Sequence, residues 1–190
     1  MKAVWKPGTM IYPLPAVMVS CGAEPDYYNI ITVSWTGTIC TDPAMCYISL
    51  RPCRHSYSII KETGEYVINL TTGRLARAAD WCGVKSGASC NKFRETGLTP
   101  VPATKVKAPL IMESPVNIEC MVKDIIELGS HHMFISEVVA VNADELLMDK
   151  RSGLFRLNDA MPLCYSHGAY YEIGKLAGSF GFSVKKKKGK

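Results

Sequence analysis

The sequence predicts a mainly β protein, an antiparallel barrel or sandwich with a few short helices. Apolar runs of strand length, rich in β-branched and aromatic residues, recur along the chain and end at turn residues. In one run, Ile118–Ile126, apolar residues alternate with the polar residues Glu119 and Lys123. Helical periodicity is confined to short segments. This spacing of strands fits an antiparallel sheet better than a parallel one.

The expected strands are taken in chain order. Those of the N-terminal half are Ala16–Cys21, Ile30–Trp35, Met45–Leu50 and Tyr66–Leu70. Those of the C-terminal half are Ile118–Ile126, His131–Val141, Leu163–Ser166 and Tyr170–Ile173. The last two form a hairpin, because His167-Gly168 between them is a turn sequence.

Three short helices are expected between these strands. The first runs from Arg54 to Glu62, after Pro52 and before Gly64. The third begins near Ser89 and ends at Gly97. The second is marked by apolar residues at helical spacing, with a cap before them and a stop after them: Leu75, Ala78, Ala79 and Cys82, with Thr72 as cap and Gly83 as stop. The stretch Thr99–Pro115 carries four prolines and is expected to be a connecting loop.

Composition and charge narrow the class of protein. The chain has 190 residues, of which 47% are hydrophobic and 21% charged, so most of it is expected to fold. One domain is predicted over residues 1–184, with 185–190 as a basic, disordered tail. The formal net charge of +5 comes from this tail, which holds five of the 22 basic residues and leaves 17 basic against 17 acidic residues. The body is therefore not expected to bind nucleic acid.

Eight cysteines are present, but their pattern does not indicate disulfides. They form no Cys-x-x-Cys pair, and several lie in apolar runs, where a thiol acts as a small hydrophobic group. Pro7, Pro13 and Pro15 interrupt the N-terminal segment, which carries no export signal. No segment reaches the ~20 apolar residues of a membrane span. A reducing cytoplasm without membrane attachment is the expected location.

Several familiar catalytic motifs are absent from the sequence. It contains no Gly-x-Gly-x-x-Gly, no P-loop and no Gly-x-Ser-x-Gly. His131 and His132 lack partners at metal-ligand spacing, and neighbouring residues of a strand face opposite sides. We therefore expect no metal site and no catalytic residue of these kinds.

Polar and cationic residues gather in three segments where predicted strands end or helices begin. They are Asn29–Thr36, Ser49–Tyr57 and Cys82–Phe93. In the second, a helix start beside Arg51 and Arg54 is suited to bind an anion through free N–H groups and guanidinium groups. The alternative is a proline-terminated strand with solvated arginines, and the spacing alone leaves both open.

Together, these segments resemble the flavin reductase-like family, and within it the flavoredoxin branch. The likeness spans roughly residues 10–175. It is carried by Asn29–Trp35, Thr41-Asp42-Pro43, Ile48–Arg51, Arg54–Tyr57, Gly64–Leu70, Ala79–Gly83, Ser86-Gly87, Lys92-Phe93, Ala108–Ile111, Pro115–Cys120 and His131 with Phe134–Val138. The resemblance implies an antiparallel Greek-key split β-barrel, a homodimer, and one FMN per subunit bound without a covalent link.

The resemblance also implies roles for individual residues. The FMN phosphate would meet Arg51, Ser49 and the helix start at Ser56 and Tyr57. The pyrimidine edge of the ring would meet Asn29, Ser56 and Lys92. The backbone of Ser34, Trp35 and Thr36 would reach the ring near N5 and O4, with the Trp35 side chain packed against it.

Positive charge near the ring would come from Lys92 and His131, which favours the reduced, anionic flavin. The chain departs from the family pattern at two positions. Asn91 stands where relatives often have Asp, and Cys164 stands where an aromatic residue commonly covers the flavin.

Two functions are consistent with the resemblance. In one, NAD(P)H acts as a transient donor of hydride to FMN, and the electrons pass to free flavin or to an acceptor protein. In the other, the protein is an electron carrier loaded by a partner reductase or ferredoxin. Neither needs a protein acid or base. An alternative of another class is a binding module with the same barrel that holds haem or another ligand.

Overall fold

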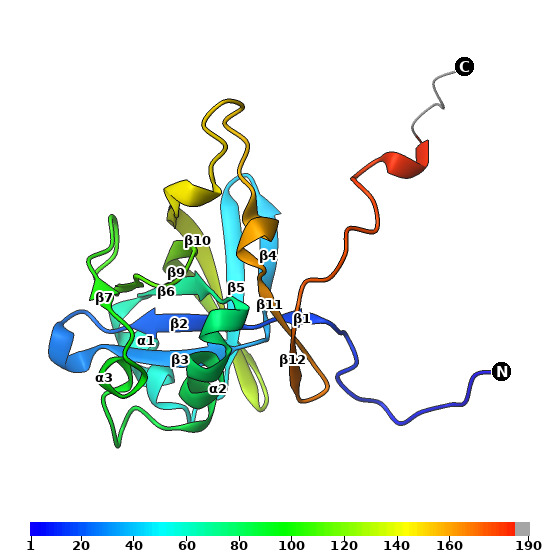
Figure 1. Cartoon of the computed structure of the whole chain (residues 1–190). Coiled ribbons are helices and arrows are strands. Elements are labelled where there is room, and N and C mark those ends of the chain that lie inside the picture. The colour runs from blue at the N-terminus through cyan, green and yellow to red at the C-terminus, as the bar shows by residue number, and fades with distance from the viewer. Residues whose placement is uncertain (185–190) are drawn as a thin grey trace, which may run out of the picture.

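A seven-stranded antiparallel sheet forms the centre of the computed structural model, which describes residues 1–184 (Figure 1). The expected tail, 185–190, lies outside the described residues. The strands follow the order β3-β2-β6-β9-β10-β5-β4 across the sheet, so β3 and β4 are its two edges. Their bounds are β2 Val17–Cys21, β3 Asn29–Val33, β4 Thr36–Thr41, β5 Ala44–Leu50, β6 Glu65–Leu70, β9 Val116–Leu128 and β10 His131–Ala143.

Two smaller sheets complete the β structure. One has the order β1-β11-β12, and the other pairs β7 with β8. Their strands are β1 Leu14–Pro15, β7 Pro100–Val101, β8 Leu110–Ile111, β11 Leu163–Ser166 and β12 Ala169–Glu172. All strand pairs are antiparallel, which confirms the predicted fold class.

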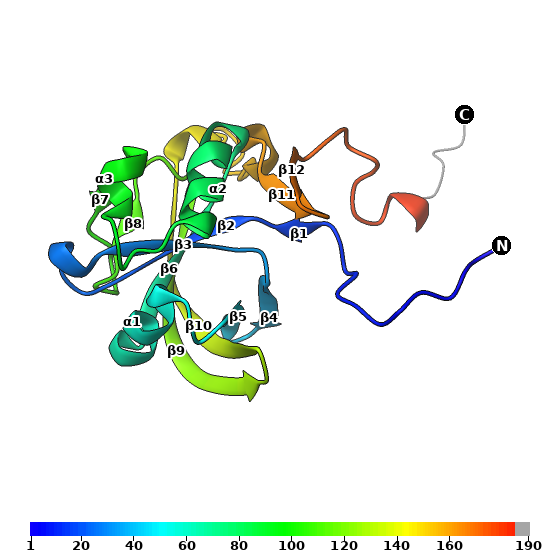
Figure 2. The same cartoon turned by 90° about the horizontal axis from the view of Figure 1, so that it is seen from below.

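The helices are short, and the α-helices lie on both faces of β2 and β3. The α-helices are α1 His55–Thr63, α2 Ala76–Val84 and α3 Lys92–Thr96, and the 3-10 helices are Pro25–Tyr27, Gly73–Leu75, Glu145–Leu147, Leu157–Ala160 and Phe182–Val184. Figure 2 shows α1 on one side of β3 and α2 on the other. Consecutive residues of β2 explain this arrangement: Val17 and Val19 pack into a core with Ile60 of α1, whereas Met18 packs with Ala79 of α2 and Phe93 of α3.

The main core joins side chains of β2, β3, β5, β6, β9, β10 and α1. Tyr66 of β6 and Phe134 of β10 are fully buried there. The Tyr66 hydroxyl donates to Ser136 Oγ at 2.8 Å, so its polar atom has a partner. Cys46 and Cys120 lie in the same core. All eight cysteines, each within residues 1–184, are unpaired thiols.

Some element boundaries differ from the sequence predictions. Helix α2 continues through Gly83 and is capped by Lys85, while Thr72 precedes a 3-10 turn instead of capping α2 with its side chain. Helix α3 begins at Lys92, because the Asn91 side chain accepts the Arg94 N–H and fixes the start there.

Two strand predictions were also incomplete. The expected strand Ile30–Trp35 ends at Val33, and a second strand, β4, begins at Thr36. The expected loop Thr99–Pro115 contains the short strands β7 and β8. No helix among residues 1–184 is long and apolar enough to cross a membrane.

The buried carboxylate of Glu119 anchors the segment between β7 and β8. It accepts backbone N–H groups of Thr104, Lys105 and Val106, and the side-chain amide of Asn142. Burial alone would raise the pKa of Glu119, but these hydrogen bonds outweigh it and hold the pKa below its ordinary value. The loop is therefore tied to the sheet by an ionised group.

Candidate functional site

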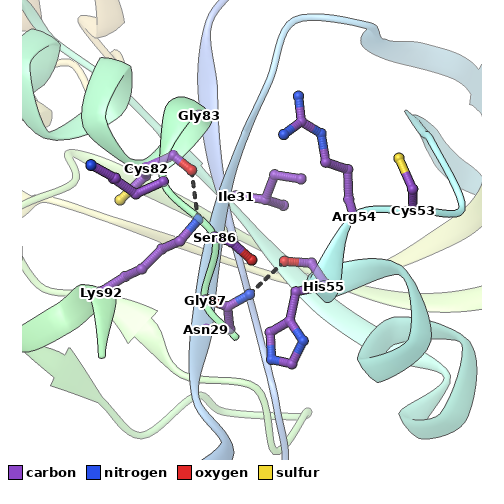
Figure 3. A pocket seen from close by; sticks show the side chains of 12 residues that line it. Asn29, Ile31, Cys53, Arg54, His55, Cys82, Gly83, Ser86, Gly87 and Lys92 are labelled. Carbon is purple, nitrogen blue, oxygen red and sulfur yellow. Dashed lines mark hydrogen bonds between the residues drawn. The ribbon is translucent and has the colours of Figure 1, made fainter. Parts of the chain in front are cut away.

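Two adjacent cavities lie along the outer edge of β3. The first, of about 150 Å³, is enclosed by β3, the start of α1, the end of α2 and the loop that leads to α3 (Figure 3). The second, of about 250 Å³, lies between β3, the ends of β5 and β10, and the N-terminal segment. Ile31 and Arg54 line both cavities, so the two are neighbours.

Lys92 is a buried cationic residue in the first cavity. It is only 3% exposed, and its Nζ donates to the carbonyl oxygen of Cys82 at 2.6 Å. Within residues 1–184, no carboxylate lies within ion-pair distance of it. Burial lowers the pKa of Lys92, and the nearby Arg54 lowers it further. An ammonium group without a counter-ion makes this cavity suitable for an anion.

Asn29 and Ser56 connect β3 to α1 inside the same cavity. The Asn29 side-chain amide donates to Ser56 Oγ at 2.8 Å (Figure 3). Gly87 packs directly on Asn29, since a Cβ atom at Gly87 would lie 2.1 Å from Asn29 Oδ1. The loop before α3 thus closes the cavity only because residue 87 lacks a side chain.

Helix α1 directs its N-terminus toward this region. Arg54 is the N-cap residue, no side chain caps the helix, and its first turn holds no acidic residue. The first N–H groups of a helix have no partner within the helix and carry partial positive charge. The guanidinium of Arg54 adds a full charge beside them. Figure 3 shows Arg54 and Lys92 on either side of Ile31.

The second cavity has aromatic walls. Trp35 and His131 meet edge to face with ring centroids 4.3 Å apart, and Tyr12 and Tyr165 line another part with centroids 6.3 Å apart. Such walls fit a flat apolar ring. The cavity is also lined by Arg51 and Arg54, so it combines apolar surfaces with positive charge.

His131 does not supply that charge at neutral pH. Burial lowers the pKa of His131, and the positive charges of Arg51 and Arg54 lower it further. Its ordinary pKa is 6.5, so the ring is neutral at pH 7. In the ligand-free protein, Arg51 and Arg54 therefore carry the positive charge of this cavity, and a cationic His131 beside a reduced flavin stays a prediction.

Eight of the eleven residues predicted for the site line one of the two cavities. Asn29, Ser56 and Lys92 line the first, and Ser34, Trp35, Ser49, Arg51 and His131 line the second. The three residues expected at the pyrimidine edge, Asn29, Ser56 and Lys92, do line one cavity together. The residues expected at the phosphate are divided, because Ser56 lines the first cavity. Lys92 shares its cavity with the start of α1, whereas Ser49 and Arg51 lie in the other cavity.

Thr36, Tyr57 and Cys164 line neither cavity. The Thr36 hydroxyl donates to the carbonyl oxygen of Tyr47 at 2.6 Å, within the sheet. The Tyr57 hydroxyl bonds His132 Nδ1 at 2.8 Å, and its ring packs on Phe134 in the core. The side chains of Thr36 and Tyr57 thus have structural partners within residues 1–184.

Cys164 lies beside an aromatic residue that does line the second cavity. Cys164 pairs with Pro15 of β1 and Tyr171 of β12. Successive side chains of a strand alternate in direction, so Tyr165 lines the cavity and Cys164 does not. Tyr165 thus provides an aromatic surface in the cavity, one position after Cys164.

Tyr12 was missed by the sequence interpretation. It lines the second cavity and also stacks near His167, with ring centroids 4.3 Å apart. The pairing of Leu14 with Tyr165 brings it there. No local motif marks Tyr12, because its neighbours are a short proline-rich segment and its contact is with residues about 150 positions away.

Comparison with known proteins agrees with this architecture. The family model for the flavin reductase like domain matches residues 9–174. Flavoredoxin of Desulfovibrio vulgaris (Miyazaki F) is 32% identical, with a TM-score of 0.89 over 97% of this chain and 100% of that chain. Flavoredoxin from Methanosarcina acetivorans is 21% identical, with a TM-score of 0.86 over the same shares, 97% and 100%.

A third solved structure identifies the fold as a split barrel. A Shewanella frigidimarina protein with a split barrel domain is 24% identical, with a TM-score of 0.79 over 88% of this chain and 85% of that chain. The sheet described above is therefore the split barrel that the sequence indicated.

Proposed function

The chain belongs to the flavin reductase-like family, in its flavoredoxin branch, and is a flavin-related redox protein. On this premise, we propose that it binds FMN without a covalent link and passes electrons through it. Two adjacent cavities of complementary chemistry carry the proposal. Ordinary ligand pockets measure about 300–1,000 Å³. Each cavity alone is smaller, so a ligand with a charged end and a flat ring would occupy both. FMN has this form.

The donors of the first cavity fit a phosphate group. Lys92 and Arg54 supply positive charge, the start of α1 supplies N–H groups, and Ser56 supplies a hydroxyl. Asn29 Nδ2 already donates to Ser56 Oγ, which orients that hydroxyl for a further partner. We assign the phosphate to this cavity instead of to Arg51 and Ser49.

The second cavity fits the ring of a flavin. Trp35, Tyr12 and Tyr165 offer aromatic surfaces, and the end of β3 offers backbone groups at Ser34 and Trp35. Ser49 N donates to the Trp35 carbonyl oxygen at 2.8 Å, which fixes that segment. Arg51 and Arg54 favour any ligand that gains negative charge there. A bound flavin supplies hydride and single-electron transfer.

A comparison of FMN with riboflavin, which lacks the phosphate, tests this assignment. Lys92→Met and Arg54→Ala should weaken FMN binding roughly tenfold or more and leave riboflavin binding nearly unchanged. Trp35→Ala should weaken both ligands by a similar factor. Flavin fluorescence titration measures each dissociation constant. Equal loss of both ligands in Lys92→Met would contradict a phosphate in the first cavity.

The absorption spectrum of the purified protein tests the ligand class itself. Bands of oxidised flavin support the proposal. A Soret band would indicate haem, and a colourless protein that cannot be reconstituted with FMN would reject it.

A second part of the proposal concerns the molecule that reduces the bound flavin. We propose NAD(P)H as a transient donor, with a redox partner protein or free flavin as acceptor. The alternative route is the transfer of electrons to the bound flavin from a partner reductase or ferredoxin. Stopped-flow bleaching of the flavin absorbance with NADH, NADPH or reduced ferredoxin distinguishes them. Bleaching by ferredoxin but by neither nucleotide would make the protein an electron carrier.

We also propose a cytoplasmic location and a homodimer. Eight unpaired thiols, including the exposed Cys53, support a reducing compartment. Mass spectrometry of the protein alkylated in intact cells would test the redox state of these thiols.

A further inference from the structure

A groove separate from the two flavin cavities lies at the far end of the sheet. Its volume is about 740 Å³, and it is formed by segments 72–75, 112–115, 144–147 and 159–161 together with Glu172. None of its residues lines either flavin cavity. Three large apolar side chains on its surface are exposed: Met112, Leu146 and Met161.

Acidic residues surround these apolar side chains. Glu113, Asp144, Asp159 and Glu172 line the groove, against the single arginine Arg74. The groove is therefore lined by both exposed apolar and negatively charged side chains. Exposed apolar surface beside charged groups is typical of a docking site for a segment of matching character.

The C-terminal arm, residues 174–184, has the matching character. It follows β12 and carries the exposed apolar side chains Leu176, Phe180, Phe182 and Val184. Lys175 lies within it, and five further lysines follow it in the sequence between residues 185 and 190, whereas residues 173–190 include no acidic residue. The arm is thus apolar and the sequence that follows it is strongly basic, whereas the groove is apolar and acidic.

The path of the arm leads away from its own groove. Ile173 N donates to the Pro162 carbonyl oxygen at 3.2 Å, next to the groove. Beyond it, the chain runs outward from the body, on the same side as the N-terminal segment (Figures 1 and 2). Its apolar side chains remain exposed along this path, and a soluble protein rarely leaves such a series uncovered.

We propose that the C-terminal arm of one copy docks in the acidic groove of a second copy of this chain. Phe180 and its apolar neighbours cover Met112, Leu146 and Met161, and the positive charge of the C-terminal sequence complements the carboxylates that line the groove. Two copies related by a two-fold axis exchange arms reciprocally, which closes the assembly as a dimer. The inference concerns residues outside the flavin cavities and does not depend on flavin binding.

A carbodiimide cross-linker tests the proposal on the full chain, because it joins a lysine ammonium to a carboxylate only when the two are in contact. Chains of natural and of heavy-nitrogen isotope composition are mixed before cross-linking. Mass spectrometry should find arm lysines joined to groove carboxylates in peptide pairs of mixed isotope composition. Pairs of one isotope composition only would show docking within one chain and overturn the proposal.

Matched variants make the test specific. Leu146→Ser and Phe180→Ser should each lower the yield of these mixed cross-links about tenfold, because each removes a buried apolar contact of the docked arm. Leu146 is 91% exposed and Phe180 lies outside the body, so neither change disturbs the fold. Leu154→Ser, an exposed leucine outside the groove, should leave the yield unchanged.

Other cross-linking results would contradict the docking of the arm in the groove. Cross-links spread over acidic residues elsewhere on the surface, or a yield that neither variant alters, would overturn the proposal. Flavin retention should be the same in all three variants. A chain that binds no flavin but still forms the mixed cross-links would refute the proposed function and leave this inference standing.

Discussion

Gly87 lies against the side chain of Asn29, so closely that a Cβ atom at position 87 would stand 2.1 Å from Asn29 Oδ1. The same Asn29 side chain donates to Ser56 at the start of α1. Three segments distant in sequence therefore meet at one amide group, and the loop before α3 depends on a glycine to reach it.

Gly87→Ala should weaken FMN binding roughly tenfold, because the added methyl group displaces Asn29 and breaks its bond to Ser56. Asn29 can move as a side chain, so the free energy of unfolding should fall by only about 1 kcal/mol, the contribution of its bond to Ser56. Fluorescence titration and thermal unfolding measure the two effects. Gly174→Ala, with open space around its Cβ position, is the control and should change neither. Loss of stability without loss of affinity would contradict a role of this contact in the site.

FMN affinity should fall as pH rises, at values below the ordinary lysine pKa of 10.5. Burial lowers the pKa of Lys92, so the ammonium that would bind the phosphate loses its proton earlier than an exposed lysine does. Titrations at pH values above about 8, where the phosphate stays a dianion, isolate this effect. Riboflavin binding should not change with pH in this way, and in Lys92→Met the pH dependence of FMN binding should match that of riboflavin binding.

The lowered pKa of Lys92 also predicts that replacing this lysine with methionine stabilises the ligand-free protein. A lysine whose folded pKa is lowered destabilises the fold at pH values below that pKa, and the cost disappears as pH rises to the unfolded value. Ligand-free Lys92→Met should therefore be more stable than the native chain at pH 7, with the difference shrinking toward pH 10.5. Denaturant unfolding at several pH values checks the sign.

Tyr57→Phe should reduce stability and leave FMN affinity unchanged. The variant loses the 2.8 Å bond between the Tyr57 hydroxyl and His132 Nδ1, worth about 1 kcal/mol. This corresponds to a fall in Tm of roughly 2–4 °C for a chain of this size. Tyr27→Phe, at an exposed tyrosine, should alter neither property. A loss of affinity at unchanged Tm would mean that Tyr57 contacts the ligand, as the sequence interpretation expected.

Glu119→Gln should lower the free energy of unfolding at pH 7 by about 2–3 kcal/mol, since a charged acceptor of four hydrogen bonds is replaced by a neutral one. The folded pKa of Glu119 lies below the ordinary value of 4.5. Its contribution is thus complete above pH 4.5 and is lost as pH falls through the folded pKa. The difference between the native chain and the variant should shrink in acid, as urea unfolding at pH 7 and pH 3 would reveal. A constant difference would contradict the role of the charge.

The strands with the strongest local signals were predicted well. Leu163–Ser166 agrees with β11, and Tyr66–Leu70 lies within β6. These runs are bounded by turn residues and rich in β-formers, so local preference and burial act together. The β4 segment, Thr36–Thr41, has no such run. It forms a strand because Thr36 pairs with Ile48 of β5, and that stabilisation comes from a partner which local pattern cannot reveal.

The ends of the helices also show which features local sequence predicts and which depend on tertiary contacts. Gly97 was predicted to end α3 and does so in the left-handed conformation, which glycine adopts without strain. Gly83 was predicted to end α2 but lies within it, packed near Thr32 of β3. A contact with the sheet extends the helix past a residue of low helix propensity.

The sequence by itself determined the fold class, the family and most of the residues that line the two cavities, because motif residues and strand patterns are local properties. The tertiary structure decided which of these residues share a cavity, that two arginines near His131 lower its pKa, and that Tyr12 and Tyr165 form an aromatic wall. Cavity membership and pKa depend on distances between segments far apart in the chain, and these distances exist only once the strands have paired and the helices have packed.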